Sequence, residues 1–477
     1  MRQLQKSAFF FAVPFSNIIY AMKNNTLIRS ENLVSNIILF CLPIMLGTLL
    51  QQLYNAVDVM VIGNTLGSIG IAAVGGSSGM IIIMMTGLFT GLSSGITVVI
   101  SRHTGEGDDE KVRAAVETSI LFSIAGGILF TIIGIAFTPL FLRLMDTPEE
   151  IMKDSVTYLR FYFAGITGVF VYNSASAVIR ARGDSSTPLF ILAICTVINI
   201  VLDIILVVAF KTGVAGVALA TAVSQGISAV LSVVFIFRKG KGLGSGFIRM
   251  KFSPDEFGEM IRIGLPGALQ SVMNSVSGIV MTVAVNTLGT FAVAGNTAYA
   301  KLDGIFWMVS TAFGVTASTF AAYYWGKRDT VKVKKVFASC LWLDAAMSVC
   351  ISIFFFTASP LLLRLFTRDS GVISSGMEVM KAIAPYYALV SLFEITGAVL
   401  RGMGNVIIPM AVNILFLCFG RIFWIEAFLP LTGKNSLYDV ILSCPATWLC
   451  TALFMVPYYL ASSSRLFRKL EKQKEKA

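Results

Sequence analysis

The sequence predicts an all-α membrane protein with twelve transmembrane helices, arranged as two parallel six-helix repeats. Three observations support this prediction. The chain is 56% hydrophobic and only 13% charged, with a mean hydropathy of +0.80, whereas a soluble domain is about 25% charged. Apolar runs long enough to cross a bilayer as helices recur along the 477 residues. The second half also repeats the first at an offset of 221 to 223 residues.

Twelve apolar runs define the predicted spans, and each is too continuous for the alternating strands of a membrane β-barrel. In chain order they are 33–62, 68–100, 112–142, 151–180, 186–210, 214–238, 257–286, 291–325, 333–363, 376–401, 405–429 and 437–463. Lys and Arg are concentrated before the first span, after the even-numbered spans and after the last one. This distribution predicts a multi-pass protein of the plasma membrane with both termini in the cytoplasm. It also explains the net charge of +11 through contact with anionic membrane lipid, so we expect no nucleic-acid partner.

Short sequence matches locate the repeat. The pairs are Leu42-Pro43 with Leu265-Pro266, NTLG (64–67) with NTLG (286–289), PLFLRL (139–144) with PLLLRL (360–365), and VIRARGD (178–184) with VLRGMGN (399–405). Because each copy holds an even number of helices, both enter the membrane from the same side and face each other across a central cavity. The predicted parts are an N-terminal cytoplasmic extension (1–32), an N-lobe (33–238), a cytoplasmic linker (239–256), a C-lobe (257–464) and a basic cytoplasmic tail (465–477).

The residues that build common catalytic and metal sites are scarce. The seven cysteines include no C-x-x-C pair, and the single histidine, His103, falls in a predicted cytoplasmic loop. Neither a disulfide framework nor a permanent metal site is therefore indicated. Because no serine–histidine arrangement or phosphate-binding loop lies at a membrane face, we expect the protein not to be an enzyme and to need no cofactor.

Two spans of the predicted N-lobe carry polar residues at helical spacing, and each set includes an aspartate. The sets are Thr196, Asn199 and Asp203 in the fifth span, and Gln51, Tyr54, Asn55 and Asp58 in the first. Positions i, i+3 and i+7 share one face of a helix. A carboxylate in mid-span costs roughly 2.5–3.5 kcal/mol, so both aspartates are expected to face the interior of the lobe.

The predicted C-lobe keeps neither aspartate. On the repeat offset Asp203 falls on Trp424, and Asp58 falls near Val280 or Met281. A purely structural polar pair has no obvious reason to occur in one lobe only. Two neighbouring carboxylates in a low dielectric cannot both ionise at low cost, so we expect the pair to take up H⁺ or a hard cation such as transiently bound Na⁺. The alternative is that each aspartate only hydrogen-bonds to a neighbouring helix.

Other residues of the spans are weaker candidates. Pro43 lies inside the first span, where the missing backbone hydrogen bond predicts a kink and, with Asp58 further along, a hinge. Glu394 in the tenth span is the repeat equivalent of Asn173 in the fourth, and it is a possible cation or substrate site of the C-lobe.

Two further patterns stand in the second and eighth spans. Gly87, Gly91 and Gly95 follow the small-x-x-x-small spacing that favours close helix packing in membranes. Lys301 is a possible substrate residue of the C-lobe, unless it pairs with Asp303 or with neighbours one turn away.

Several segments together resemble a known family. They are LPIMLGTLLQQLYNAVDVMVIG (42–63), VIRARGDSSTP (178–188) with its echo VLRGMGNVIIP (399–409), and GVAGVALATAVSQ (213–225). As a set, and over residues 33–465, the chain resembles the multidrug and toxic compound extrusion (MATE) transporters of bacteria. The resemblance implies a V-shaped, two-lobe bundle that exports cationic or amphipathic compounds in exchange for H⁺ or Na⁺.

The resemblance also implies site residues. The positions that match the N-lobe cation network of bacterial and archaeal members are Asp58, Asn199, Asp203, Asn173 and Thr221. The chain departs from the family in the seventh span, where members that rely on a C-lobe acidic residue carry Glu and this chain has Asn274. This difference argues against a C-lobe cation route at that position and leaves Glu394 as a substitute.

We expect exchange by alternating access, in which the lobes rock and expose the central cavity to one side at a time. Cation binding at the aspartates then bends the first helix near Pro43 and releases the compound. The main alternative is a lipid-linked oligosaccharide flippase of related architecture, which needs several cationic side chains inside the spans; only Lys301 and Arg421 qualify clearly. A channel is a further alternative, although buried acids in a duplicated chain favour a carrier. We expect the protein to act as a monomer.

Overall fold

The structure is a computed structural model that describes residues 32–239, 250–433 and 436–474. Its described elements are helices, and twelve of them, some in consecutive segments, are long and apolar enough to cross a membrane. The predicted all-α fold with twelve spans is therefore confirmed. Most of the predicted N-terminal extension, most of the predicted linker and the end of the predicted tail lie outside the described residues.

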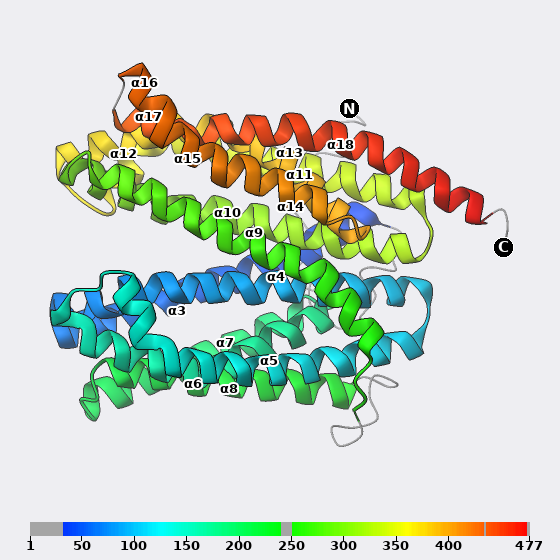
Figure 1. Cartoon of the computed structure of the whole chain (residues 1–477), viewed down its shortest axis with the longest axis horizontal. Helices are drawn as coiled ribbons and strands as arrows, with labels where there is room; N and C mark the ends of the chain where they lie inside the picture. The colour runs from blue at the N-terminus through cyan, green and yellow to red at the C-terminus, as the bar shows by residue number, and fades with distance from the viewer. Residues whose placement is uncertain (1–31, 240–249, 434–435, 475–477) are drawn as a thin grey trace, which may run out of the picture.

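The two lobes lie one above the other in Figure 1, with their helices running along the long axis of the molecule. The N-lobe consists of α3 (Leu33–Gly75), α4 (Ser77–Glu106), α5 (Asp109–Leu144), α6 (Glu149–Ala181), α7 (Ser186–Asp203), the π-helical segment η2 (Ile204–Ala209) and α8 (Val214–Lys239). Its six spans match the six predicted ones, except that the predicted second span begins in the last turns of α3 and continues in α4.

The C-lobe follows the same order with more interruptions. It consists of α9 (Pro254–Asn286), α10 (Thr290–Gly326), α11 (Thr330–Arg364), α12 (Ser370–Ile383), η4 (Ala384–Tyr386), α13 (Tyr387–Gly402), α14 (Ile407–Asn413), η5 (Ile414–Gly420), α15 (Arg421–Phe423), η6 (Trp424–Phe428), α16 (Leu429–Thr432), α17 (Leu437–Ile441) and α18 (Ser443–Lys474). The fifth span of each lobe contains π-helical turns, which are frequent at functional sites.

The repeat also appears in the turns and helix caps. Gly67 (φ +67°) separates the first span from the second, and Gly289 (φ +97°) separates α9 from α10 at the equivalent place. A positive φ is open to glycine without steric cost. Asp108 and Asp329 cap α5 and α11 in the same manner, since each accepts a 3.0 Å hydrogen bond from the backbone N–H three residues later.

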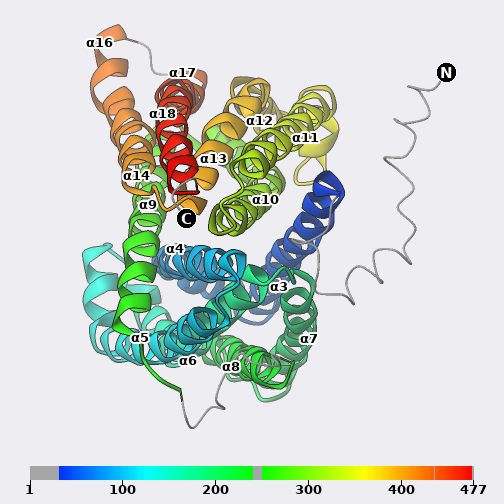
Figure 2. The same cartoon turned by 90° about the vertical axis from the view of Figure 1, so that its right-hand side faces the viewer.

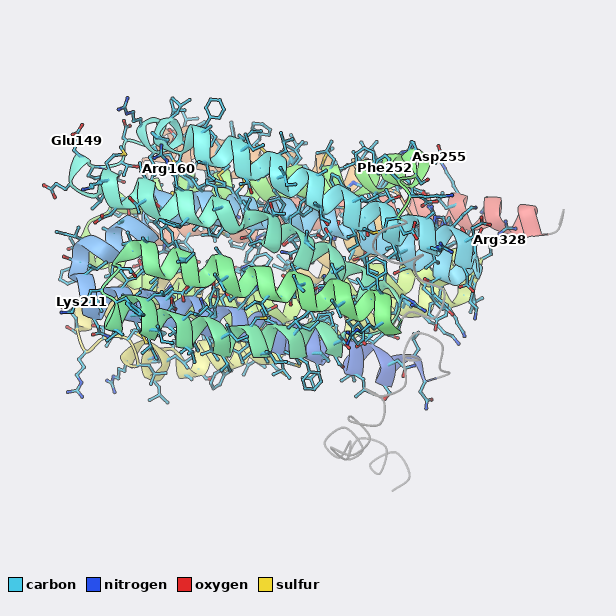
Figure 3. All side chains as sticks on the ribbon, turned by 90° about the horizontal axis from the view of Figure 1, so that it is seen from below. Glu149, Arg160, Lys211, Phe252, Asp255 and Arg328 are labelled. Atoms are coloured by element: carbon cyan, nitrogen blue, oxygen red, sulfur yellow. The ribbon has the colours of Figure 1, made fainter. Side chains whose placement is uncertain are left out.

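Burial distinguishes central from peripheral helices. Among the 18 most apolar consecutive residues of α6 and of α10, 72% of the residues are buried, whereas the buried share is 22% in α5 and in α11. The outer helices therefore present apolar side chains to the surroundings, as lipid contact requires. Charged residues gather at the two ends of the bundle in Figure 3, with Glu149 and Lys211 at one end and Asp255 and Arg328 at the other.

The first helix of each lobe begins against the opposite lobe. Phe40 of α3 belongs to the apolar core of the C-lobe, where its ring packs edge-on against Phe320 at a centroid distance of 5.4 Å. In the same way Phe257 of α9 packs against Phe122 of α5 at 5.2 Å, and Met260 is buried in an N-lobe core. Figure 2 shows α3 and α9 crossing between the lobes on opposite sides of the molecule. The lobes are therefore joined by exchanged helix ends.

Candidate functional site

The two N-lobe aspartates meet inside their lobe. Asp58 comes from α3, and Asp203 is the last residue of α7, directly before the π-helical segment η2. Their carboxyl groups are neighbours, and their side chains are 6% and 0% exposed. The adjacent residues Val59 and Ile204 point outward and are 40% and 51% exposed. The structure thus brings together the two charged residues of the predicted polar sets and turns both away from the outer surface.

Five buried polar atoms in these polar sets have no hydrogen-bond partner among the residues that the structure describes. They are Asp58 Oδ1, both carboxyl oxygens of Asp203, and Oδ1 and Nδ2 of Asn199. Asn199 lies one turn before Asp203 on the same face of α7 and is fully buried. Buried polar groups in proteins are nearly always satisfied, and four of these five atoms are oxygens. Carboxylate and amide oxygens are the ligands of hard cations, and a proton on one carboxyl group supplies a donor, so the residues fit either ion.

Tyrosine hydroxyl groups of α3 and α6 lie near the aspartates, and one of them reaches a threonine of α8. Tyr54, one turn before Asp58 on α3, donates a hydrogen bond of 3.1 Å to Thr221 Oγ1 of α8. Tyr158 of α6 is buried close to both aspartates. Thr221 is therefore linked to α3 through Tyr54. Tyr158 could not be selected from the sequence, because a tyrosine in an aromatic-rich span has no positional signal of its own.

No contact among the described residues links Asn173 or Pro43 to the two aspartates. The Asn173 amide donates to the backbone carbonyl of Val169 at 2.8 Å, and within the described residues no hydrogen bond joins it to Asp58 or Asp203. Pro43 is buried inside α3, and the residue with non-helical backbone angles in that helix is Gly67.

The C-lobe holds a half-buried carboxylate of its own at Asp303. It accepts hydrogen bonds from the hydroxyls of Tyr299 (2.8 Å) and Tyr387 (2.7 Å) and from the indole of Trp307 (2.9 Å). Lys301 is exposed, and it forms no ion pair with any described residue. Asp303 therefore bonds to aromatic neighbours, two of them one turn away, and not to Lys301.

A cavity of about 290 Å³ lies between the lobes, and we call it the central cavity. Residues of α4, α6, α9, α10 and α13 line it, and most carry small hydroxyl or amide groups. Asn173, Asn274 and Glu394 are among them, whereas Lys301 is not. The cavity is therefore polar and draws on both lobes, as the predicted duplication requires.

Two arginines, Arg180 of α6 and Arg401 of α13, also line the central cavity, and they are repeat equivalents. The expectation that only Lys301 and Arg421 place cationic groups inside the spans is therefore wrong. Lys301 and Arg421 do not line the central cavity. Helices α6 and α13 continue to Ala181 and Gly402, and the arginine in the last turn of each helix faces the cavity. The repeat match between VIRARGD and VLRGMGN contained both residues.

Beyond the central cavity, towards the end of α4, the lobes are in tight contact. A Cβ on Gly105 would lie 2.0 Å from the carbonyl oxygen of Tyr323, and a Cβ on its repeat equivalent Gly326 would lie 2.1 Å from that of Arg102. We call this pair of contacts the glycine seam. Gly91 and Gly95 approach the backbone of α9 as closely, so the predicted close-packing ridge of α4 is present.

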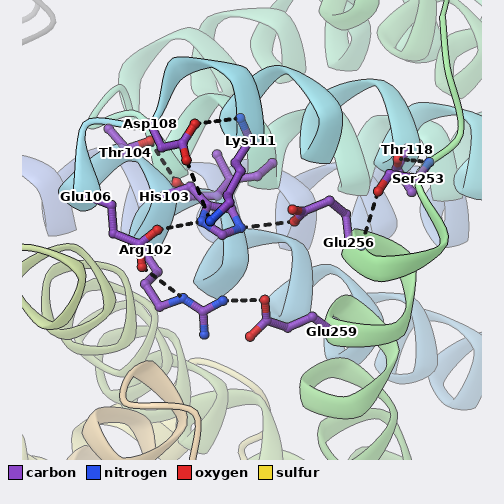
Figure 4. Close-up of polar contacts among 11 residues, drawn as sticks. Arg102, His103, Thr104, Glu106, Asp108, Lys111, Thr118, Ser253, Glu256 and Glu259 are labelled. Carbon is purple, nitrogen blue, oxygen red and sulfur yellow. Dashed lines mark hydrogen bonds and ion pairs between the residues drawn. The ribbon is translucent and has the colours of Figure 1, made fainter.

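Figure 4 shows an ion-pair cluster beside the glycine seam. His103 lies between Glu106 (Nδ1 to Oε2, 2.9 Å) and Glu256 (Nε2 to Oε2, 3.0 Å), and Arg102 pairs with Glu259. The expectation that His103 lies in a loop is wrong, because α4 continues to Glu106 and buries it. His103, Glu256 and Glu259 are close enough to share a metal ion, but their partners in the cluster already satisfy them.

Comparison with known proteins extends over most of the chain. The model of the MatE family matches residues 43–205 and 266–423, one segment in each repeat. The chain is 27% identical to the probable multidrug resistance protein YpnP of Bacillus subtilis, over 85% of this chain and 89% of that protein. It is 26% identical to the multidrug export protein MepA of Staphylococcus aureus, over 72% and 75% of the two chains.

Solved structures share the fold. A MATE protein crystallised in the bent conformation superposes with a TM-score of 0.87 at 20% identity, over 94% of this chain and 99% of that one. A transporter of the MOP superfamily from Pyrococcus furiosus gives a TM-score of 0.86 at 20% identity, over 93% and 98%. The two-lobe architecture is therefore common to this chain and to these proteins.

Proposed function

Since the chain belongs to the MATE family of membrane transporters, we propose that it is a secondary antiporter that exports cationic or amphipathic compounds in exchange for H⁺ or Na⁺. Its relatives are named multidrug resistance and multidrug export proteins, which supports small-molecule efflux. We place it in the plasma membrane with both termini in the cytoplasm, as the distribution of Lys and Arg suggests. Alternating access of the central cavity is the proposed mode of transport.

The neighbouring Asp58 and Asp203 carboxyl groups are the single observation that carries the antiport proposal. Both are buried, and three of their four oxygens have no hydrogen-bond partner within residues 32–239, 250–433 and 436–474. An isolated pair of negative charges in this environment is costly, so the pair gains free energy by binding a proton or Na⁺. Each elementary charge that moves inward across 100 mV contributes roughly 2.3 kcal/mol, which supports a substrate gradient of roughly fifty-fold.

Coupling requires that the bound ion change the relative stability of the two conformations. Asp58 lies on α3 and Asp203 lies on α7. These two helices also line a small cavity next to the central one, and Asn173 and Arg180 line both cavities. Neutralising the carboxyl pair removes the repulsion between α3 and α7. We propose that the resulting shift of α3, with Pro43 as the hinge, alters the wall of the central cavity and lowers its affinity for the exported compound.

Dye efflux from proteoliposomes tests this proposal, with the H⁺ and Na⁺ gradients imposed one at a time. We expect one of the two gradients to drive export of ethidium by the wild-type protein, and Asp203→Asn to abolish this gradient-driven export. Asp344→Asn is the matched control, because Asp344 is a fully buried aspartate of the C-lobe that bonds to Ser310. If Asp203→Asn inserted normally and exported the dye at the wild-type rate, the carboxyl pair would not be the coupling site.

The arginines of the central cavity raise the flippase alternative again, because a pyrophosphate headgroup needs cationic partners. The charged residues that line the cavity are Arg180, Arg401 and Glu394, which leaves a formal charge of only +1. A volume of about 290 Å³ is at the lower end for drug-sized pockets. Both properties favour a small molecule over a lipid-linked oligosaccharide.

A further inference from the structure

A second, smaller cavity adjoins the central one inside the N-lobe. It measures about 100 Å³ and lies between α3, α6 and the start of α7, with Pro43 and Gln51 on its α3 side. Asn173 and Arg180 line both cavities and therefore form the wall that the two share. We call the smaller one the side cavity. A molecule in the central cavity thus meets the side cavity at these two residues.

Three groups that can donate hydrogen bonds line the side cavity and have no hydrogen-bond partner in the described part of the chain. They are Arg180 Nε, Ser176 Oγ and Ser185 Oγ, and each of the three atoms is buried. Ser176 lies one turn before Arg180 on α6, so both face the same side of the helix, and Ser185 directly precedes α7. No carboxylate lines the side cavity, and no ion pair reaches Arg180 from any described residue.

Arg180 is half-buried, and arginine remains protonated in proteins. Its buried Nε has no hydrogen-bond partner among the described residues, and a buried donor without a partner is costly. A bound anion that accepts hydrogen bonds from the guanidinium and from the two serine hydroxyls relieves this cost. Arginine and hydroxyl donors fit the planar, two-oxygen geometry of a carboxylate.

The repeat gives an internal comparison. Arg401, the equivalent of Arg180, has Glu394 as a partner, with Nη2 3.9 Å from Oε1. The residue equivalent to Glu394 in the N-lobe is Asn173, whose amide is turned to the carbonyl of Val169. Arg401 therefore has a carboxylate of the same chain as its ion-pair partner. Arg180, at the same place in its lobe, has no such partner among the described residues.

We propose that Arg180, Ser176 and Ser185 form a subsite for a carboxylate of the transported compound, whose other end occupies the central cavity. The inference rests on the proposed function, because it assumes that the central cavity receives substrates. It narrows the substrate class to amphipathic compounds that carry a carboxylate, including zwitterions whose cationic group faces Glu394. The net formal charge of +1 around the central cavity agrees with an anionic group in the substrate.

The test compares tetramethylrhodamine, which has a free carboxylate, with its methyl ester, in which an uncharged methyl ester replaces that carboxylate. Equilibrium binding of each dye to the purified protein in chloride-free buffer is measured by fluorescence anisotropy. We expect Arg180→Gln to weaken binding of the free acid by about tenfold or more, since a hydrogen-bonded charge pair is lost. Binding of the ester is expected to change by less than about twofold, which also shows that the variant is folded.

Two further variants make the test specific. Arg180→Lys keeps the positive charge and should recover part of the affinity for the free acid. Arg401→Gln removes the same unit of charge from the central cavity, but from a guanidinium that already has Glu394 as a partner, so it should weaken binding of the free acid much less. Equal losses in Arg180→Gln and Arg401→Gln, equal losses for acid and ester, or no binding of the acid to the wild-type protein would each overturn the subsite.

The binding assay uses no ion gradient, so its result does not depend on whether the protein is an antiporter. A carboxylate preference that depends on Arg180 would stand even if Asp203→Asn exported ethidium normally. Conversely, normal coupling with no effect of Arg180→Gln on the acid would remove the subsite and leave the antiport proposal intact.

Discussion

The glycine seam gives the sharpest prediction about conformational change. In the Gly105→Ala variant the new Cβ would lie 2.0 Å from the Tyr323 carbonyl oxygen and 2.9 Å from its carbonyl carbon. An ordinary contact begins at 3.4 Å, so α4 and α10 must move apart by about 1.4 Å at this point. The obstructing atoms belong to the backbone, and no side chain can swing aside to make room.

Overpacking of this kind costs about 1–3 kcal/mol. The cost falls only on the conformation in which the seam is closed, so it shifts the balance towards conformations in which α4 and α10 are separated there. A free-energy difference of this size changes the ratio of the two populations by roughly 5- to 150-fold. Gly326→Ala should act similarly, because its Cβ would lie 2.1 Å from the Arg102 carbonyl oxygen.

Hydrogen exchange followed by mass spectrometry measures the effect on peptides that cover the ends of α4 and α10. We expect faster exchange in both peptides for Gly105→Ala and for Gly326→Ala, since exchange reports the population of open states. Gly258→Ala is the matched control, because a Cβ on this helical glycine of α9 meets no atom within 4 Å. Exchange in Gly105→Ala that equals that of the wild type and of the control would refute the idea that this contact holds the closed state.

Two further predictions concern packing around the lobes. Asp303→Asn should lower the free energy of unfolding by about 1.5–3 kcal/mol, because Tyr299, Tyr387 and Trp307 all donate to the Asp303 carboxylate. Thermal unfolding measures this loss. The exposed Lys301 provides the control, and an equal loss in Lys301→Gln would contradict the prediction. Glu256→Gln should speed exchange at the end of α4 by removing the charge that faces His103 Nε2. Asp255→Asn, an exposed neighbour on α9, should leave that exchange unchanged, and an identical effect of the two variants would argue against a role for the ion-pair cluster.

The architecture of the protein followed from regularities of the sequence. Apolar runs of spanning length set the helix count, and the offset of about 221 residues paired features that the structure then paired again, such as Gly67 with Gly289. The meeting of Asp58 with Asp203 was predictable too, because each aspartate lies on the polar face of an otherwise apolar helix, and such faces turn inward in a membrane.

Features that depend on how the lobes meet were not predictable in the same way. Helix periodicity says which face is polar, but it does not say which residue of the opposite lobe faces it. Gly105 had no distinguishing context until its contact with Tyr323 was known. Arg180 was placed at a membrane boundary, and only the full length of α6 and the course of α13 show that it faces a cavity together with Arg401.

The exchanged ends of α3 and α9 bear on how the protein is made. A nascent chain that has emerged only as far as α8 already contains the first turns of α3, but not the surface that buries them, since Phe40 packs against Phe320 of α10. The first turns of α3 can therefore reach their final packing only after α10 has been synthesised. The ancestral duplication has in this way produced two halves that mature as one unit.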